Sequence, residues 1–331
     1  MGNSSYSLLF NKFNMLDNIV KKFDYLFSSK YSSFINIKNR EIFIPNDILK
    51  SYQIKLKNFF ESKYSFPDYV TWFVKNKSIK DNAELHLWKK YIINIDIQNF
   101  FDFIDRKKLF FFVSKYSSNP NLILDYLIYK WKLPQGAPSS PILSNIVFNE
   151  IDKEIISWLK HFRIKFSYSR YVDDISIWFN SYDDRYKLYN LVKLIIEKHN
   201  FRINVKKTKL FQSNKKLFVT GMIINDSSVW IWYKKYKELR KKIYKYLKFW
   251  EGYFPYIKWY LVRIKGIDYY RFHQLKIYFF SKYNNNLSYQ ELFWINEKWY
   301  PKKTKYFDKN LKKEKFSVKE FYSKKDKYLF Y

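Results

Sequence analysis

The sequence contains no cysteine, and only 5 of its 331 residues are glycine and 8 are proline. Without cysteine there can be no disulfide framework and no metal site built on thiolates. No stretch reaches the roughly 18–20 consecutive apolar residues of a membrane-spanning helix, and the first residues lack the pattern of a secretory signal. We therefore expect a soluble cytoplasmic protein with no membrane partner.

Acidic residues are also scarce, with 30 Asp and Glu against 62 Lys and Arg, which gives a formal net charge of +32. An AT-rich genome accounts for part of the lysine content but does not require acidic residues to be rare. A chain with this excess repels itself unless a polyanion neutralises it. Nucleic acid is the first candidate, and an anionic membrane surface is the second.

The hydrophobic pattern predicts an α+β protein whose helices and strands are segregated, without repeating βα units. A length of 331 residues suggests two or three subdomains. Helices are expected over 5–30, 45–60, 104–131, 142–162, 183–200 and most of the chain after 233. Strands are expected in a hairpin over 34–44, at 91–97, on both sides of residues 173–174, within 211–225 and at 228–232.

Three aspartates occupy strand ends in this pattern. Asp96 ends an apolar run, and Asp173-Asp174 separates two others. Each alone is most simply a solvated turn or strand end. Carboxylates delivered side by side from a buried sheet repel one another and require cations. Oxygen ligands without His or Cys favour Mg²⁺ or Mn²⁺, and two such ions suit phosphoryl transfer.

Four motifs, in order along the chain, resemble those of reverse transcriptases. Together they cover about residues 37–225. They are the first-aspartate motif Asp96-Ile-Gln-Asn-Phe-Phe101, the segment Pro134-Gln-Gly-Ala-Pro-Ser-Ser-Pro-Ile-Leu-Ser-Asn145, the Y-x-D-D motif Tyr171-Val-Asp-Asp174 and the Lys-Thr motif Ile203-Asn-Val-Lys-Lys-Thr-Lys209.

The resemblance implies an RNA-directed DNA polymerase with a right-hand fold. The fingers would comprise 1–90 and 104–164, with the helix after the Pro-Gln-Gly loop packing on the palm. The palm, an antiparallel sheet that carries the aspartates, would comprise 91–103 and 165–232. The helical basic thumb and a C-terminal RNA-binding region would comprise 233–331. Two Mg²⁺ ions, or Mn²⁺, would be the cofactors.

The resemblance also implies roles for individual residues near the metals. Phe101 would be the steric gate that excludes a 2′-hydroxyl and so selects deoxynucleotides. The metal site would comprise Asp96, Ile97, Asp173 and Asp174, with Asp174 in a lesser role.

Five further residues complete the expected nucleotide site. Gln135 and Gly136 would shape the pocket, with Gly136 allowing close backbone approach. Lys38 and Arg40 would clamp the triphosphate, unless they belong to a solvated turn. Lys207 is a candidate proton donor to pyrophosphate, or else a lysine that lines the groove.

Two more motifs resemble retron reverse transcriptases, which make branched RNA-linked DNA from a dedicated structured RNA. They are Asn82-Ala-Glu-Leu-His86 and Val219-Thr-Gly221. Asn82 and His86, four residues apart, are expected on one helical face, where they contact RNA or act as a helix cap and a core histidine. Trp72-Phe73 replaces a common glycine and Val172 a common alanine, which leaves another bacterial lineage open.

The segment 234–248 has an apolar stripe (Tyr236, Leu239, Ile243, Leu247) opposite a lysine-rich face. In a polymerase this face would contact nucleic acid, although a solvated surface is the usual alternative. A lysine-rich tail follows over 300–331. The RNA-binding candidates on the helix are Lys234, Lys235, Arg240, Lys241, Lys242 and Lys245.

The leading functional prediction is a retron-like enzyme of an anti-phage defence system. Its partners would be a structured non-coding RNA that serves as template and primer, the DNA product, the RNA–DNA hybrid, deoxynucleoside triphosphates and a separate effector protein. The alternatives are another bacterial reverse transcriptase, for defence or an intron, and a non-catalytic RNA-binding scaffold.

Overall fold

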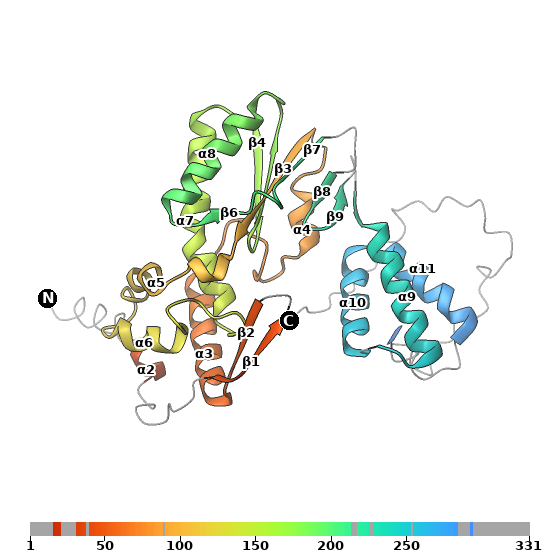
Figure 1. Ribbon diagram of the computed structural model, residues 1–331, viewed down its shortest axis with the longest axis horizontal. Helices are drawn as coiled ribbons and strands as arrows, with labels where there is room; N and C mark the ends of the chain where they lie inside the picture. The colour runs from red at the N-terminus through yellow and green to blue at the C-terminus, as the bar shows by residue number, and fades with distance from the viewer. Residues whose placement is uncertain are drawn as a thin grey trace, which may run out of the picture. The chain divides into compact units, whose positions relative to one another are not determined.

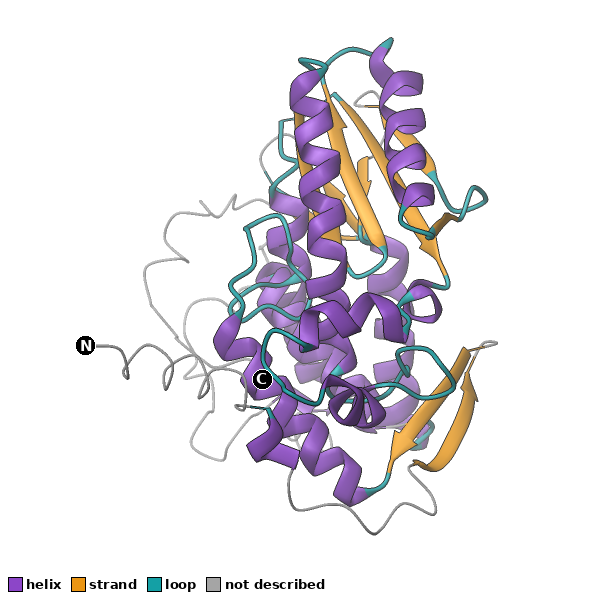
Figure 2. Cartoon of the chain, turned by 90° about the vertical axis from the view of Figure 1, so that its left-hand side faces the viewer, coloured by secondary structure: helices purple, strands orange, loops and turns teal. Residues whose placement is uncertain are grey.

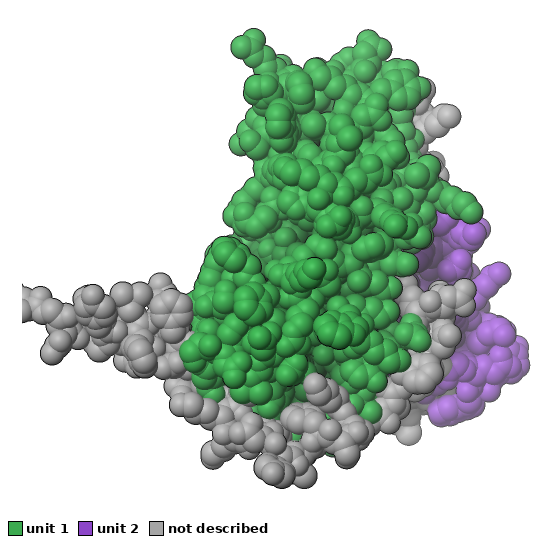
Figure 3. All heavy atoms as spheres, turned by 60° about the vertical axis from the view of Figure 1, so that its left-hand side comes forward, with its two compact units in different colours: residues 1–230 green, residues 231–331 purple. Residues whose placement is uncertain are grey.

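The structure is a computed structural model that describes residues 16–20, 31–37, 40–88, 90–212, 217–224, 228–252, 254–283 and 292–293. The chain divides into two compact units, residues 1–230 and 231–331, which Figure 3 colours separately. Helices and antiparallel sheets are both present, so the predicted α+β class is confirmed. No helix in these described ranges is long and apolar enough to cross a membrane.

An antiparallel sheet of five strands lies at the centre of the first unit. Its main path runs β4 (Phe166–Tyr171), β5 (Asp174–Phe179), β3 (Tyr91–Gln98) and β6 (Arg202–Ile203), and β7 (Lys209–Gln212) pairs with the first half of β3. Helices α7 (Ser140–His161) and α8 (Asp184–Lys198) lie side by side over one face (Figures 1 and 2). Ile92, Ile93, Ile95 and Ile97 of β3 are all buried, as expected of a strand whose two faces are both covered.

A group of helices, α2 (Asp17–Val20), α3 (Asp47–Lys63), α5 (Arg106–Val113) and α6 (Pro120–Leu127), packs below the sheet in Figure 1. The prediction of one helix over 104–131 is wrong, because α5 and α6 are separate. Asp17 accepts hydrogen bonds from the hydroxyls of Ser117 and Ser118 in the break. The Asn119 side chain then caps α6, whose first residue is proline, a residue that favours a helix start.

The predicted hairpin is present as β1 (Tyr31–Ile37) and β2 (Arg40–Pro45), paired antiparallel with Ile37 opposite Arg40. The Phe43 N–H of β2 donates to the Gln135 carbonyl at 2.8 Å. This bond ties the hairpin to the Pro-Gln-Gly loop. Lys38 lies outside the described residues, as does the Arg40 side chain, so their predicted contacts stay predictions.

A small sheet has the strand order β10 (Val229–Ile231), β9 (Met222–Ile224) and β8 (Leu217–Val219), in which β8 and β9 pair antiparallel. The short helix α4 (Ile79–Glu84) contacts β9. A capping box between Ser78 and Asp81 starts α4, and the helix ends before His86. The prediction that Asn82 and His86 share one helical face is therefore wrong.

The second unit contains α9 (Tyr233–Phe249), α10 (Phe254–Ile267) and α11 (Tyr269–Tyr283). Leu239, Ile243 and Leu247 of the predicted apolar stripe are buried. The six candidate residues Lys234, Lys235, Arg240, Lys241, Lys242 and Lys245 are exposed. The helix α9 is thus amphipathic as predicted, while the lysine-rich tail over 300–331 lies outside the described residues.

Candidate active site

Strand register brings the three predicted aspartates together. Asp96 on β3 is the direct partner of Asp174 on β5, and partners in an antiparallel pair lie about 4.5–5.5 Å apart. The Ile97 N–H donates to the Asp173 carbonyl at 2.9 Å. The carboxylate-bearing residues thus meet at one end of two neighbouring strands, although they are 77 and 78 positions apart in the sequence.

The turn between β4 and β5 consists of Val172 and Asp173, with Tyr171 paired to Asp174. Val172 has φ +62°, a left-handed conformation that β-branched residues rarely adopt. Arg170 donates from Nη1 to the Val172 carbonyl at 3.2 Å. The Arg170 side chain on β4 therefore stabilises the strained turn through this hydrogen bond.

Lys207 lies directly against Asp96. Its Nζ is 2.9 Å from Oδ1 and 3.2 Å from Oδ2 of Asp96, whose side chain is only about one tenth exposed. The backbone fixes this arrangement, because Asn204 N–H donates to the Asp96 carbonyl at 2.8 Å and Lys207 N–H to the Asn204 carbonyl at 3.1 Å. The protein itself places a cation on this carboxylate.

The donor chemistry at this turn fits Mg²⁺, since the acids offer oxygen ligands and Asp96 already accepts a cation. Within the described part of the chain, no three carboxylate or imidazole side chains are arranged as a metal cluster. The metal roles of Asp96, Ile97, Asp173 and Asp174 therefore stay predictions supported by register and chemistry.

Gly136 lies where no side chain fits. Its φ is +105°, and a Cβ atom would come within 2.5 Å of the Phe43 carbonyl oxygen and 2.9 Å of Ile42 Cγ2. The neighbouring Gln135 accepts the Phe43 N–H through its carbonyl, and Ser140 Oγ anchors the loop by donating to the Pro134 carbonyl at 2.6 Å. The predicted pocket residues thus lie against the hairpin that carries Lys38 and Arg40.

Phe101 follows Asp96 on a short 3₁₀ helix (Phe100–Phe103). Asn99 precedes it with φ +46°, which turns the chain sharply after β3. Phe100 is buried against Phe148 and Phe201, while Phe101 is half-buried and packs edge-on against Trp72 with ring centroids 6.2 Å apart. The predicted gate is therefore held by aromatic contacts on two sides.

A buried ion pair lies beneath the aspartate turn. Arg170 and Asp152 are both fully buried, and Arg170 donates from Nε and Nη2 to the Asp152 carboxylate at 2.8–3.0 Å. The Tyr168 hydroxyl donates to the same carboxylate at 2.5 Å. Burial raises the pKa of Asp152, and the bonds from Arg170 and Tyr168 oppose that shift.

Asn145 extends this network. Its Oδ1 accepts from Arg170 Nη1 at 3.0 Å, and its Nδ2 donates to the Trp72 carbonyl at 2.7 Å. One sequence signal points to this pair: Asn145 and Asp152 are seven residues apart, and so lie on one face of α7. Nothing in the sequence identified Arg170 as their shared partner.

Asn82 and His86 are both fully buried. Asn82 accepts from the Thr71 hydroxyl at 2.9 Å and donates to Thr220 Oγ1 at 3.3 Å, so the two retron-like motifs are joined directly. His86 Nε2 is 2.7 Å from Ser169 Oγ on β4. The structure thus favours the internal role that the sequence left open over direct RNA contact by these side chains.

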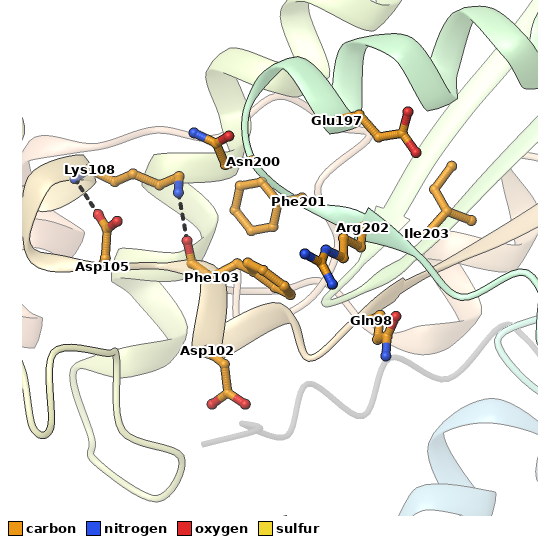
Figure 4. Close-up of a pocket in the computed structure, with 10 residues that line it drawn as sticks. All are labelled: Gln98, Asp102, Phe103, Asp105, Lys108, Glu197, Asn200, Phe201, Arg202 and Ile203. Atoms are coloured by element: carbon orange, nitrogen blue, oxygen red, sulfur yellow. Dashed lines mark hydrogen bonds between the residues drawn. The ribbon is translucent and has the colours of Figure 1, made fainter.

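A hollow of about 600 Å³ opens beyond the end of β3 (Figure 4). It is lined by Gln98, Asp102, Lys108 and Arg202 among others. Lys108 donates to the Phe103 carbonyl at 2.7 Å, and burial lowers the pKa of Lys108. The mixed acidic and basic lining does not select an anion, so the predicted triphosphate site is not placed here.

Comparison with known proteins agrees with this geometry. A family profile described as "Reverse transcriptase (RNA-dependent DNA polymerase)" matches residues 28–247, which is about two thirds of the chain. The chain belongs to the reverse transcriptase family. Retron Ec86 reverse transcriptase of Escherichia coli is 32% identical over 209 residues, covering 62% of this chain and 64% of that protein.

Retron Se72 reverse transcriptase of Salmonella heidelberg is 30% identical over 218 residues, covering 62% of this reverse transcriptase and 57% of that protein. The chain thus spans less than two thirds of both relatives. Apo telomerase from Candida tropicalis is structurally similar, with a TM-score of 0.52 at 11% identity over 88% of this chain and 64% of that one. At that identity the similarity concerns the fold alone.

Proposed function

We propose that this reverse transcriptase is an active RNA-directed DNA polymerase with a right-hand fold. The fingers would lie within 1–90 and 104–164, the palm within 91–103 and 165–232, and the thumb after 233. The observation that carries the proposal is the register of Asp96 with Asp174 beside the Asp173 turn. A binding scaffold would not require a buried carboxylate, a strained turn and a lysine to converge at one strand end.

The chain's own residues divide the work at this site. Asp96 and Asp173 would hold two divalent ions, assisted by Asp174 and Ile97. Such ions activate the attacking hydroxyl and stabilise the leaving pyrophosphate when bound. Lys207 would donate a proton to pyrophosphate after leaving Asp96, while Phe101 would exclude the ribose 2′-hydroxyl and Gly136 would let the backbone approach the base pair.

We further propose that the template is a structured RNA and the product RNA-linked single-stranded DNA, as in a retron. Support comes from the two retron relatives and from the bond between Asn82 and Thr220, which unites the two retron-like motifs. The exposed lysines of α9 would bind RNA phosphates. A defence role with a separate effector protein belongs to this proposal.

The test is to co-express the chain with the RNA transcribed from its flanking DNA and to purify the complex. We expect DNA covalently joined to RNA, shortened by RNase and absent from an Asp173→Asn variant of equal thermal stability. Equal product from Asp173→Asn would refute the catalytic assignment. DNA synthesis on poly(rA)/oligo(dT) without any RNA-linked product would favour another bacterial reverse transcriptase.

A further inference from the structure

Trp72 contacts both the predicted sugar gate Phe101 and the hydrogen-bond network beside the aspartate turn, which are far apart in the sequence. Its ring packs edge-on against Phe101 with an interplanar angle of 77°. Its carbonyl accepts the Asn145 amide, and Asn145 is held by Arg170, which also bonds the Val172 carbonyl. One run of contacts therefore joins the aspartate turn to the predicted sugar gate.

The backbone that precedes Trp72 is hydrogen-bonded to β4 at Arg170. Arg170 N–H donates to the Tyr69 carbonyl at 2.7 Å, and Thr71 N–H donates to the Arg170 carbonyl at 3.1 Å. The buried Thr71 hydroxyl also lies 3.2 Å from the Arg170 carbonyl and donates to Asn82. Hydrogen bonds to Arg170 on both sides of Val70 thus fix the backbone that leads into Trp72, and the Asn145 bond fixes the Trp72 carbonyl.

Phe101 contacts two aromatic rings, those of Phe100 and Trp72. It is half-buried and follows a left-handed residue, Asn99, and Phe100 contacts it from within the core at 5.5 Å between ring centroids. On the other side the contact is with Trp72. A gate that excludes a hydroxyl must not yield when a ribose presses against it, so a rigid neighbour decides how well it discriminates.

We propose that Trp72 is a specificity-determining residue that braces the Phe101 gate, with Asn145 and Arg170 as its positioning residues. This inference rests on the proposed polymerase function. The Trp72 ring covers that side of the gate. The tryptophan of this chain should therefore strengthen selection of deoxynucleotides over ribonucleotides.

The experiment measures kcat/KM for dTTP and for UTP on poly(rA)/oligo(dT), and takes the ratio as the discrimination. Trp72→Ala should lower the ratio by about 10-fold or more, chiefly by raising kcat/KM for UTP. Trp72→Phe should restore most of the ratio because it keeps a ring. If Trp72→Ala does not fold, Trp72→Leu makes the same test with a smaller loss of volume.

Two further variants separate positioning from general damage. Asn145→Asp keeps an oxygen for Arg170 but cannot donate to the Trp72 carbonyl, so it should also lower the ratio. Trp158→Ala removes a tryptophan that is 42% exposed on α7 and packs on His161 and Phe162, and it should leave the ratio unchanged. Thermal denaturation of each variant shows whether a change in ratio follows folding.

The outcomes of these experiments separate a failure of the proposed role of Trp72 from a failure of the proposed polymerase function. If Phe101→Ala lowers the ratio and Trp72→Ala leaves it within twofold of the parent chain, the role of Trp72 is refuted and the polymerase stands. If the parent chain incorporates no nucleotide in the presence of Mg²⁺ or Mn²⁺, the proposed function and this inference both fall.

Discussion

Replacement of Gly136 by alanine tests how the Pro-Gln-Gly loop supports the hairpin. An L-residue at φ +105° is strained by about 1–2 kcal/mol. The added Cβ would also lie 2.5 Å from the Phe43 carbonyl oxygen, so the hairpin must move and its bond to Gln135 must lengthen. Loss of that bond adds about 1 kcal/mol, which brings the expected destabilisation to about 2–3 kcal/mol.

Gly221→Ala is the matched control, because Gly221 has φ +78° and nothing within 4 Å of its would-be Cβ. It should show only the strain, about 1–2 kcal/mol. The excess of about 1 kcal/mol for Gly136→Ala corresponds to a Tm about 2–4 °C lower than that of the control. The KM for deoxynucleotides should rise in Gly136→Ala alone, and equal Tm values with an unchanged KM would refute the reasoning.

Three other predictions concern the metal site, an ion pair on the protein surface and the lysine-rich face of α9. Lys207→Met removes the ammonium that competes with Mg²⁺ for Asp96, so the half-saturating Mg²⁺ concentration should fall. The kcat should also fall, by about 100-fold, because a proton donor is lost. A rise in both the half-saturating Mg²⁺ concentration and kcat would contradict this. The hydrogen bond from His199, and to a lesser extent that from Lys198, lowers the pKa of Glu154 below its usual 4.5. The ionised Glu154 therefore stabilises the fold above pH 4.5, and this stabilisation is lost as the pH falls through the pKa of the folded state. Glu154→Gln should therefore reduce the unfolding free energy by about 0.5–1 kcal/mol at pH 7 and by progressively less under acid, as measured by urea denaturation. Lys235→Gln and Lys241→Gln should each reduce by about 1 the slope of log affinity for RNA against log salt, and an unchanged slope would mean that this face of α9 does not contact phosphates.

The sequence predicted best those features that depend on local pattern. The apolar run before Asp96 and the two runs around Asp173 became paired strands, because alternation and turn residues act within a few positions. The prediction of a helix over 104–131 failed although a local signal was present, because Asn119 caps α6 and Pro120 starts it. Asp17 adds a non-local contact at the same break. The Lys207 contact with Asp96 spans 111 residues of sequence, and periodicity carries no information at that range.

The motif residues Asn82 and His86 show a different limit. A polar residue in a recognised motif suggests contact with substrate, but a buried polar side chain with internal partners serves equally well. Asn82 reaches both Thr71 and Thr220, so a substitution there would disturb two segments at once. Sequence alone could not choose between these readings, because exposure is a property of the folded chain.

The buried pair of Arg170 and Asp152 is difficult to explain as a source of stability. Replacement of such a pair by apolar residues is often neutral or stabilising, whereas loss of one partner costs about 3–5 kcal/mol. The pair instead positions the Arg170 guanidinium, whose Nη1 donates to both Asn145 and the Val172 carbonyl. A left-handed valine costs about 1–3 kcal/mol and persists only where its surroundings determine it. Arginine, with five donors in a planar fork, can satisfy Asp152 and hold this turn at the same time, which lysine or an apolar side chain cannot do.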